Sequence, residues 1–236
     1  MIGILIALVI SWVLVYLIEG KHLEVIGIFP KAKRLNQFFI GFIITATLCC
    51  LAQGIEVVLG TAGWTLNPGF SALQIVEGLW WNVKSVLTEE LIYRGALLYL
   101  LVRFLSPKKA MLISASAFGI YHWFSFGVFG NLVPMILIFI GTGLMGYAWA
   151  LSFYKTKSIY LAFGLHLGWN FTLNSIFSKG PLGDQLLIHR GGEMVGDVVS
   201  LINFLISMIL IPLIVFIWVK YVVVQEEWET KLNGSE

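Results

Sequence analysis

Long apolar runs separated by short polar connections make up most of the chain. A helix that crosses a membrane needs roughly 20 apolar residues. Seven runs approach this length, and the pattern therefore predicts an all-α fold: a polytopic membrane helical bundle with seven transmembrane helices, in a single domain over 1–236. The expected spans lie near residues 2–18, 36–59, 73–105, 109–126, 132–153, 158–177 and 197–224.

The third run, 73–105, is longer than one span requires. It is either an amphipathic lead-in over 73–83, which contains Glu77, followed by a span, or two separate helices. Eight spans are therefore the close alternative to seven. The first run has no basic segment before it and no small-residue cleavage site after it, so we expect a transmembrane helix there, not a signal peptide.

Basic and non-basic connections alternate between the expected spans. Basic residues mark the connections near 19–35, 103–109 and 155–157, whereas 60–72 and 127–131 carry no charge. Cytoplasmic loops are enriched in Lys and Arg. The alternation thus predicts an outside N-terminus and a cytoplasmic C-terminal tail, and it favours seven spans over eight. Tryptophans near predicted span ends are typical of the aromatic belt at the membrane surface: Trp12, Trp64, Trp149 and Trp218.

Composition supports a membrane location. The chain is 58% hydrophobic and 12% charged, with a mean hydropathy of +0.89, which is more apolar surface than a soluble domain can bury. Its net charge of +2 and the lack of a basic tract argue against a nucleic-acid partner and leave membrane lipids as the surroundings. Cys49 and Cys50 are read as small buried hydrophobes, with a lipidated or reactive thiol as the alternative.

Glu89, Glu90 and Arg94 interrupt the apolar stretch "SVLTEELIYRGALLYLLVRF" within two helical turns. An ionisable residue within a membrane costs about 2.5–3.5 kcal/mol on insertion scales, so such residues should face a cavity or a partner. Glu90 and Arg94 are i,i+4 neighbours that can pair, whereas Glu89 lies about 100° around the helix. Glu89 is then free for chemistry, and a carboxylate in an apolar site is more basic than in water. The alternative is a purely structural charge network.

Two further polar pairs lie on later spans. Phe118 and His122 share a helix face, as do His166 and Asn170. A lone histidine on an apolar helix is often only a satisfied polar residue, so each pair alone is a weak signal. Together with Glu89 they predict that the polar helices converge inside the bundle.

Glycines flank the second of these histidines. Gly164 and Gly168 have the GxxxG spacing that lets a neighbouring helix approach closely. This spacing predicts tight helix packing, whether or not the site is catalytic.

The ordered set EExxxR, FxxxH and HxxxN on successive membrane helices resembles the CPBP family, also called the ABI family. This family contains the CAAX proteases, with the type II CAAX prenyl endopeptidases as its best-known members, and bacteriocin-processing enzymes. The resemblance covers a core of about residues 86–170, in which all three motifs are intact. The first and last spans carry no signature of it.

The resemblance implies an intramembrane endopeptidase with its active site inside the bundle. Glu89 would be the general base that activates water, and His122 would help to hold that water. His166 and Asn170 would stabilise the oxyanion of the tetrahedral intermediate. The supporting residues would be Glu90, which could share in water activation, Arg94, and the packing residue Phe118.

The chemistry of the residues agrees with this assignment. Peptide hydrolysis without a serine or cysteine nucleophile needs a base for water and donors for the oxyanion. A glutamate with two histidines is also a zinc ligand set. However, HExxH is absent and the histidines lie on different spans, so we expect no cofactor and keep zinc as an alternative.

The substrate class follows from the resemblance alone. It implies a membrane-tethered or lipidated peptide, in a CAAX-type, bacteriocin or peptide-maturation, or self-immunity role. The compact chain with its short loops favours a bacterial plasma membrane. Two other classes stay open: a transporter or ion-coupled channel, and a non-catalytic immunity or scaffold protein. No inverted repeat supports a transporter, although "GTGLMG" at Gly141–Gly146 could interrupt the fifth span. The sequence leaves the oligomeric state open.

Overall fold

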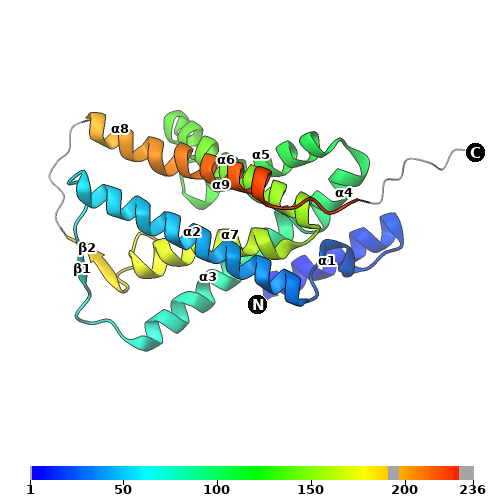
Figure 1. Ribbon diagram of the computed structural model, residues 1–236, viewed down its shortest axis with the longest axis horizontal. Coiled ribbons are helices and arrows are strands. Elements are labelled where there is room, and N and C mark those ends of the chain that lie inside the picture. Colours follow the sequence, from blue (N-terminus) through cyan, green and yellow to red (C-terminus); the bar gives the residue numbers. More distant parts are fainter. Residues whose placement is uncertain (1, 191–196, 229–236) are drawn as a thin grey trace, which may run out of the picture.

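The protein folds as a bundle of packed helices, shown in the computed structural model of Figure 1. The structure describes residues 2–190 and 197–228. The expectation of a nearly all-α membrane protein is confirmed for this part of the chain. The α-helices are α1 (Ile2–Glu19), α2 (Ala32–Val58), α3 (Ala72–Tyr93), α4 (Ala96–Phe104), α5 (Pro107–Ser125), α6 (Leu132–Thr156), α7 (Ile159–Phe171), α8 (Asp197–Leu205) and α9 (Ile211–Val222).

Shorter helical segments extend or connect these helices. A 3₁₀ turn, η1 (Leu23–Ile26), follows α1. Two π-helical segments, η2 (Thr172–Ile176) and η3 (Ile206–Leu210), continue α7 and join α8 to α9. The predicted spans over 158–177 and 197–224 are therefore each a continuous helix that contains one π-helical segment.

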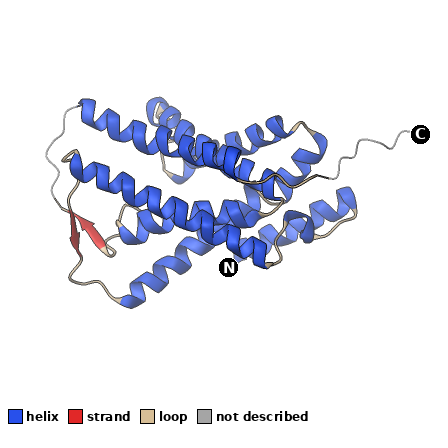
Figure 2. Cartoon of the chain, in the orientation of Figure 1, coloured by secondary structure: helices blue, strands red, loops and turns tan. Residues whose placement is uncertain are grey.

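A small antiparallel sheet, coloured red in Figure 2, is the exception to the all-α prediction. Strands β1 (Trp64–Leu66) and β2 (Leu187–His189) pair with Trp64 opposite His189. The Arg190 amide donates to the Gly63 carbonyl at 2.8 Å and prolongs the ladder. A Cβ on Gly63 would lie 2.4 Å from the Arg190 carbonyl oxygen, so only glycine fits there. Strands of three residues are too short to show an alternating pattern in the sequence.

Four helices in the described residues are long and apolar enough to cross a membrane. The count of seven or eight spans is thus not confirmed. Helices α4 and α7 have only nine and 13 residues, and α3 carries charged side chains along its length. The four qualifying helices are Ile2–Glu19, Ala32–Val58, Leu132–Thr156 and Leu201–Val222.

The long third run, 73–105, is two helices, as one of the two alternatives had it. Helix α3 ends at Tyr93 and α4 begins at Ala96. The chain bends at Gly95, where a Cβ would lie 2.2 Å from the Leu91 carbonyl oxygen. A side chain at this position would clash with the preceding turn, so the glycine permits the bend. The bend leaves Arg94, the last residue of the EExxxR motif, at the end of α3.

Helix α7 lies at the centre of the bundle, against α2, α3 and α6. The close approach expected from Gly164 and Gly168 is present, and the partner is α2, which runs beside α7 in Figure 1. A Cβ on Gly164 would lie 2.1 Å from the Phe38 carbonyl oxygen, and one on Gly168 would lie 2.2 Å from that of Phe42. The two backbones therefore touch, and α7 is held rigidly where its polar residues face α3.

Two expectations about individual residues need correction, and the structure also answers whether the glycines of 141–146 interrupt a helix. Cys49 is buried, but Cys50 is exposed on the outer face of α2. Trp149 is 3% exposed and lies in the interior, not in an aromatic belt, because it packs against the polar residues of α7. Helix α6 is continuous through Gly141–Gly146, so the glycines do not break the fifth span as a transporter site would require.

Replacing Gly168 by alanine should destabilise the protein, because the added methyl group would separate α2 from α7. Overpacking of this kind costs about 1–3 kcal/mol. Gly54→Ala is the matched control, since Gly54 lies on α2 with no atom within 4 Å of an added Cβ. Thermal unfolding in detergent should show a lower Tm for Gly168→Ala and no loss for Gly54→Ala. Equal Tm values for the two variants would contradict this packing.

Candidate active site

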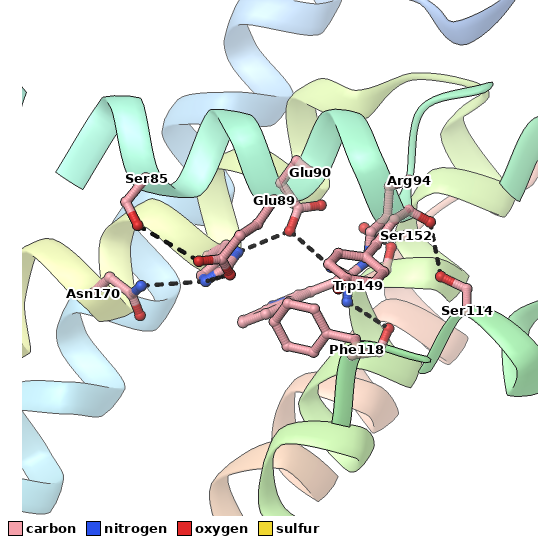
Figure 3. Close-up of polar contacts among 12 residues, drawn as sticks. Ser85, Glu89, Glu90, Arg94, Ser114, Phe118, Trp149, Ser152 and Asn170 are labelled. Carbon is pink, nitrogen blue, oxygen red and sulfur yellow. Dashed lines mark hydrogen bonds and ion pairs between the residues drawn. The ribbon is translucent and has the colours of Figure 1, made fainter. Parts of the chain in front are cut away.

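The three polar motifs meet where α3, α5, α6 and α7 come together. Glu89 and Glu90 project from the last turns of α3, with Asn170 on one side and Arg94 on the other (Figure 3). Glu90 is fully buried and is shared between two helices. Its Oε1 lies 3.2 Å from Arg94 Nη1 on α3 and 2.8 Å from His166 Nδ1 on α7. Glu90 thus links α3 to α7.

Arg94 is buried among aromatic rings. Its guanidinium carbon lies 4.2 Å from the centre of the Phe118 ring and 5.2 Å from that of Trp149. Its Nη2 donates to the Gly146 carbonyl oxygen at 3.2 Å. A Cβ on Gly146 would lie 3.1 Å from that same nitrogen, so the glycine makes room for the guanidinium. Phe118 is therefore a cation–π partner for Arg94 as well as a packing residue.

His166 is held by contacts on both ring nitrogens and on one face. The Trp149 ring stacks on it with centres 3.9 Å apart. Because Nδ1 faces the Glu90 carboxylate, Nδ1 carries a proton and donates it. Nε2 lies 3.2 Å from Asn170 Nδ2 and 3.8 Å from Glu89 Oε2. In the neutral ring Nε2 accepts from Asn170, and in the doubly protonated ring Nε2 donates.

Glu89 differs from Glu90 in its surroundings. Its side chain is 13% exposed, and it lines an open cleft of about 360 Å³. Oε1 accepts a long hydrogen bond of 3.5 Å from Ser85 Oγ, and Oε2 has no hydrogen bond within the described part of the chain. Glu89 Oε2 is buried, and it lies 3.8 Å from His166 Nε2. The other lining residues are Trp81, Lys84, Ser85, Thr88, Ile92, Tyr93 and Tyr121.

His122 lies next to Phe118, whose ring also packs near His166. Its Nδ1 lies 2.8 Å from the Phe118 carbonyl oxygen, one turn earlier on α5, and donates to it. The remaining nitrogen, Nε2, is then a lone-pair acceptor. The Phe118 ring lies 4.4 Å from the His122 ring and 5.8 Å from the His166 ring. Of the sequence-predicted residues, the structure joins Glu89, Glu90, Arg94, His166 and Asn170 by polar contacts, and it places His122 beside them.

A second polar cluster lies about two turns away along the same α3–α7 interface. Asn82 Nδ2 donates to Ser175 Oγ at 3.1 Å, and Asn174 Nδ2 donates to Asn82 Oδ1 at 2.7 Å. A Cβ on Gly78 would lie 2.6 Å from Ser175 Oγ, so the helices are close here as well. The π-helical segment η2 carries both Asn174 and Ser175. This cluster sets the register of α3 against α7.

Sequence reasoning missed this cluster and the role of Trp149. Asn82 lies seven residues before Glu89, and Asn174 lies four after Asn170, so both continue the polar faces already identified. That spacing was the available signal for the cluster. Trp149 had no signal, because only tertiary packing places it on His166.

A zinc ion bound by Glu89, His122 and His166 was the alternative left open by the sequence. Within residues 2–190 and 197–228, no group of three or more His, Cys, Asp and Glu residues is arranged to hold a metal ion. His122 has no direct polar contact with Glu89 or His166 in that part of the chain. The expectation that no cofactor is needed stays a prediction.

Apolar helices long enough to cross a membrane surround a centre that holds carboxylates and histidines, which is the arrangement of an integral membrane protein with a buried polar site. Residues 71–172 match the family described as type II CAAX prenyl endopeptidase Rce1-like. The match begins at the N-cap of α3 and ends just after α7, so it contains all the residues of the candidate site. The match supports the resemblance seen in the three motifs, and over this segment the chain is similar to the CAAX protease-like family. No curated protein and no solved structure matches the chain.

The buried Glu90–Arg94 pair gives a test of the network. Arg94→Met leaves a buried carboxylate with one partner fewer, and Glu90→Gln leaves a buried guanidinium without its counter-charge. Removing one partner of a buried pair costs about 3–5 kcal/mol. We therefore expect each single variant to unfold at lower denaturant concentration than wild type. The double variant should lose clearly less than the sum of the two, whereas additive losses would contradict a direct pair.

Proposed function

We propose that the protein is an intramembrane endopeptidase in which a water molecule activated by Glu89 hydrolyses a peptide bond. One observation carries the proposal: Glu89 faces an open cleft, and Glu90, Arg94 and His166 form a buried charge network directly behind it. Two adjacent glutamates in such different surroundings favour different roles. Glu90 positions His166, and Glu89 reacts.

The proposed reaction begins with a proton transfer from water to the Glu89 carboxylate. The water oxygen attacks the carbonyl carbon of the scissile bond, and an oxyanion forms. Asn170 Nδ2 and a doubly protonated His166 donate to that oxyanion. The C–N bond then breaks, and the proton on Glu89 passes to the leaving amine. One water is consumed, and one carboxylate and one amine are formed.

The remaining site residues assist these steps. Glu90 lies 2.8 Å from His166 Nδ1 and holds the ring with Nε2 turned toward Glu89 and Asn170. His122 has Nε2 available as an acceptor and would help to hold the attacking water. Arg94 pairs with Glu90 and so holds that carboxylate in place beside His166. Zinc is not used in this scheme.

The substrate class follows from the membrane location and the family. We propose a membrane-tethered or lipidated peptide in a CAAX-type, peptide-maturation or self-immunity role, which reaches Glu89 through the cleft. The alternation of basic connections supports a cytoplasmic C-terminal tail. The short loops of the compact chain favour a bacterial plasma membrane. The part of that tail beyond residue 228 lies outside the described residues.

Glu89→Gln is the direct test of the base. Glutamine keeps the shape and hydrogen-bonding capacity of the side chain but cannot take a proton from water. Loss of a general base lowers turnover by roughly 100- to 10,000-fold. We expect wild type to cleave members of a library of membrane-tethered and lipidated peptides in detergent, and Glu89→Gln to be folded and inactive. Cleavage is read by mass spectrometry, with and without a chelator.

Two control variants complete this experiment. Glu77→Gln removes the same charge from an exposed position on the same helix and should leave turnover unchanged. Ser85→Ala removes the hydroxyl beside Glu89 and should retain most activity, because the serine is not the nucleophile. A fully active Glu89→Gln would refute the assignment and favour a scaffold, and loss of cleavage with chelator would favour zinc.

A further inference from the structure

Lys84 lies in the same cleft as Glu89, on the same helix. Helix α3 turns one face to this cleft, and the residues on that face are Lys84, Ser85, Thr88, Glu89 and Ile92. Each of these residues has another of them three or four positions away, and residues at that spacing lie on one side of a helix. The cleft therefore has a positive charge near one end and the proposed base farther along, on a single rigid element.

The charge of Lys84 is not compensated within the described part of the chain. No ion pair joins it to a carboxylate there, and its Nζ lies 5.8 Å from the centre of the Trp80 ring. Arg94, the other cation at this helix, is paired with Glu90. Within the described residues, Lys84 is thus a cation without an ion pair in a largely aromatic cleft, a position suited to binding an anion.

The two aliphatic hydroxyl groups of the cleft are already engaged. Thr88 Oγ1 donates to the Lys84 carbonyl oxygen at 2.7 Å, and Ser85 Oγ donates to Glu89. The remaining walls are aromatic or aliphatic, formed by residues such as Trp81, Tyr93 and Tyr121. Among the lining residues, Lys84 is thus the group that can recognise a charged feature of a ligand.

We propose that Lys84 binds a carboxylate of the peptide substrate and so fixes where the chain lies relative to Glu89. This inference rests on the proposed protease function, since it assigns the peptide to the same cleft. Five helical residues separate Lys84 from Glu89 by about 7.5 Å along the axis. An extended peptide advances about 3.3 Å per residue. The carboxylate should therefore lie about two or three residues from the scissile bond. Both the free C-terminus of the peptide and an acidic side chain can supply it.

Peptide binding to full-length Glu89→Gln protein in neutral detergent tests this without relying on turnover. The probes are three fluorescent lipidated peptides of one sequence: one with a free C-terminal carboxylate, one with a C-terminal amide, and one amidated with a glutamate in place of a glutamine near the C-terminus. Anisotropy gives Kd for each peptide. Charge-assisted hydrogen bonds favour a carboxylate over its amide by roughly tenfold or more.

The added substitutions are Lys84→Met, Lys84→Arg and Lys109→Met. Lys84→Met should remove the preference for a carboxylate, and Lys84→Arg should retain it. Lys109→Met removes an exposed charge at the far end of α5 and should leave the preference unchanged. The peptide that shows the Lys84-dependent preference identifies the source of the carboxylate, either the C-terminus or the acidic side chain.

Two results would overturn the role of Lys84: equal Kd values for all three peptides when Lys84 is present, or an unchanged preference after Lys84→Met. Either result would leave the Glu89 assay unaffected. Conversely, a protein that prefers carboxylates through Lys84 but cleaves no peptide would contradict the protease function and support the binding site.

Discussion

The position of Glu90 is the constraint on which the rest of the site depends. Its carboxylate is fully buried between α3 and α7, where an uncompensated charge would be strongly destabilising. Two contacts compensate it: Arg94 one turn later on the same helix, and His166 on the neighbouring helix. Because neither partner can move without exposing the other charge to an apolar interior, the network fixes α3, α7 and the aromatic residues around Arg94 in one arrangement.

Close backbone packing supports this network from the opposite side of α7. Helix α2 packs closely against α7 at Gly164 and Gly168. The Asn82–Asn174 hydrogen bond stabilises the α3–α7 interface about two turns away from Glu89. Glu89, one residue before Glu90, is thereby turned to the cleft by about 100° of helical rotation. The same sequence pair thus supplies a buried anchor and an accessible carboxylate, and this division is the physical basis of the proposed reaction.

The sequence predicted the convergence of the polar helices, the pairing of Glu90 with Arg94 and the close approach at the glycines, because each follows from helical periodicity and the cost of buried charge. The sequence left open whether the 73–105 run is one span with a lead-in or two helices. The bend at Gly95 that separates the two helices depends on a close approach to the Leu91 carbonyl group, which no periodic pattern reveals. The sequence also placed Trp149 at the membrane surface, and only tertiary packing puts that ring on His166. The π-helical register of Asn174 and the pairing of two three-residue strands leave no periodic signal in the sequence.

The central claim is that this network leaves Glu89 to act on water and not as a covalent nucleophile. A single turnover with excess enzyme in water enriched in oxygen-18 tests it most directly. Direct attack by water places one oxygen-18 atom in the new carboxylate of the product, and this is the result we predict. If Glu89 attacked the peptide and water then released the acyl group by attacking the carboxyl carbon of Glu89, the product would carry an unlabelled oxygen from the protein. An unlabelled product in the first turnover would therefore contradict the account.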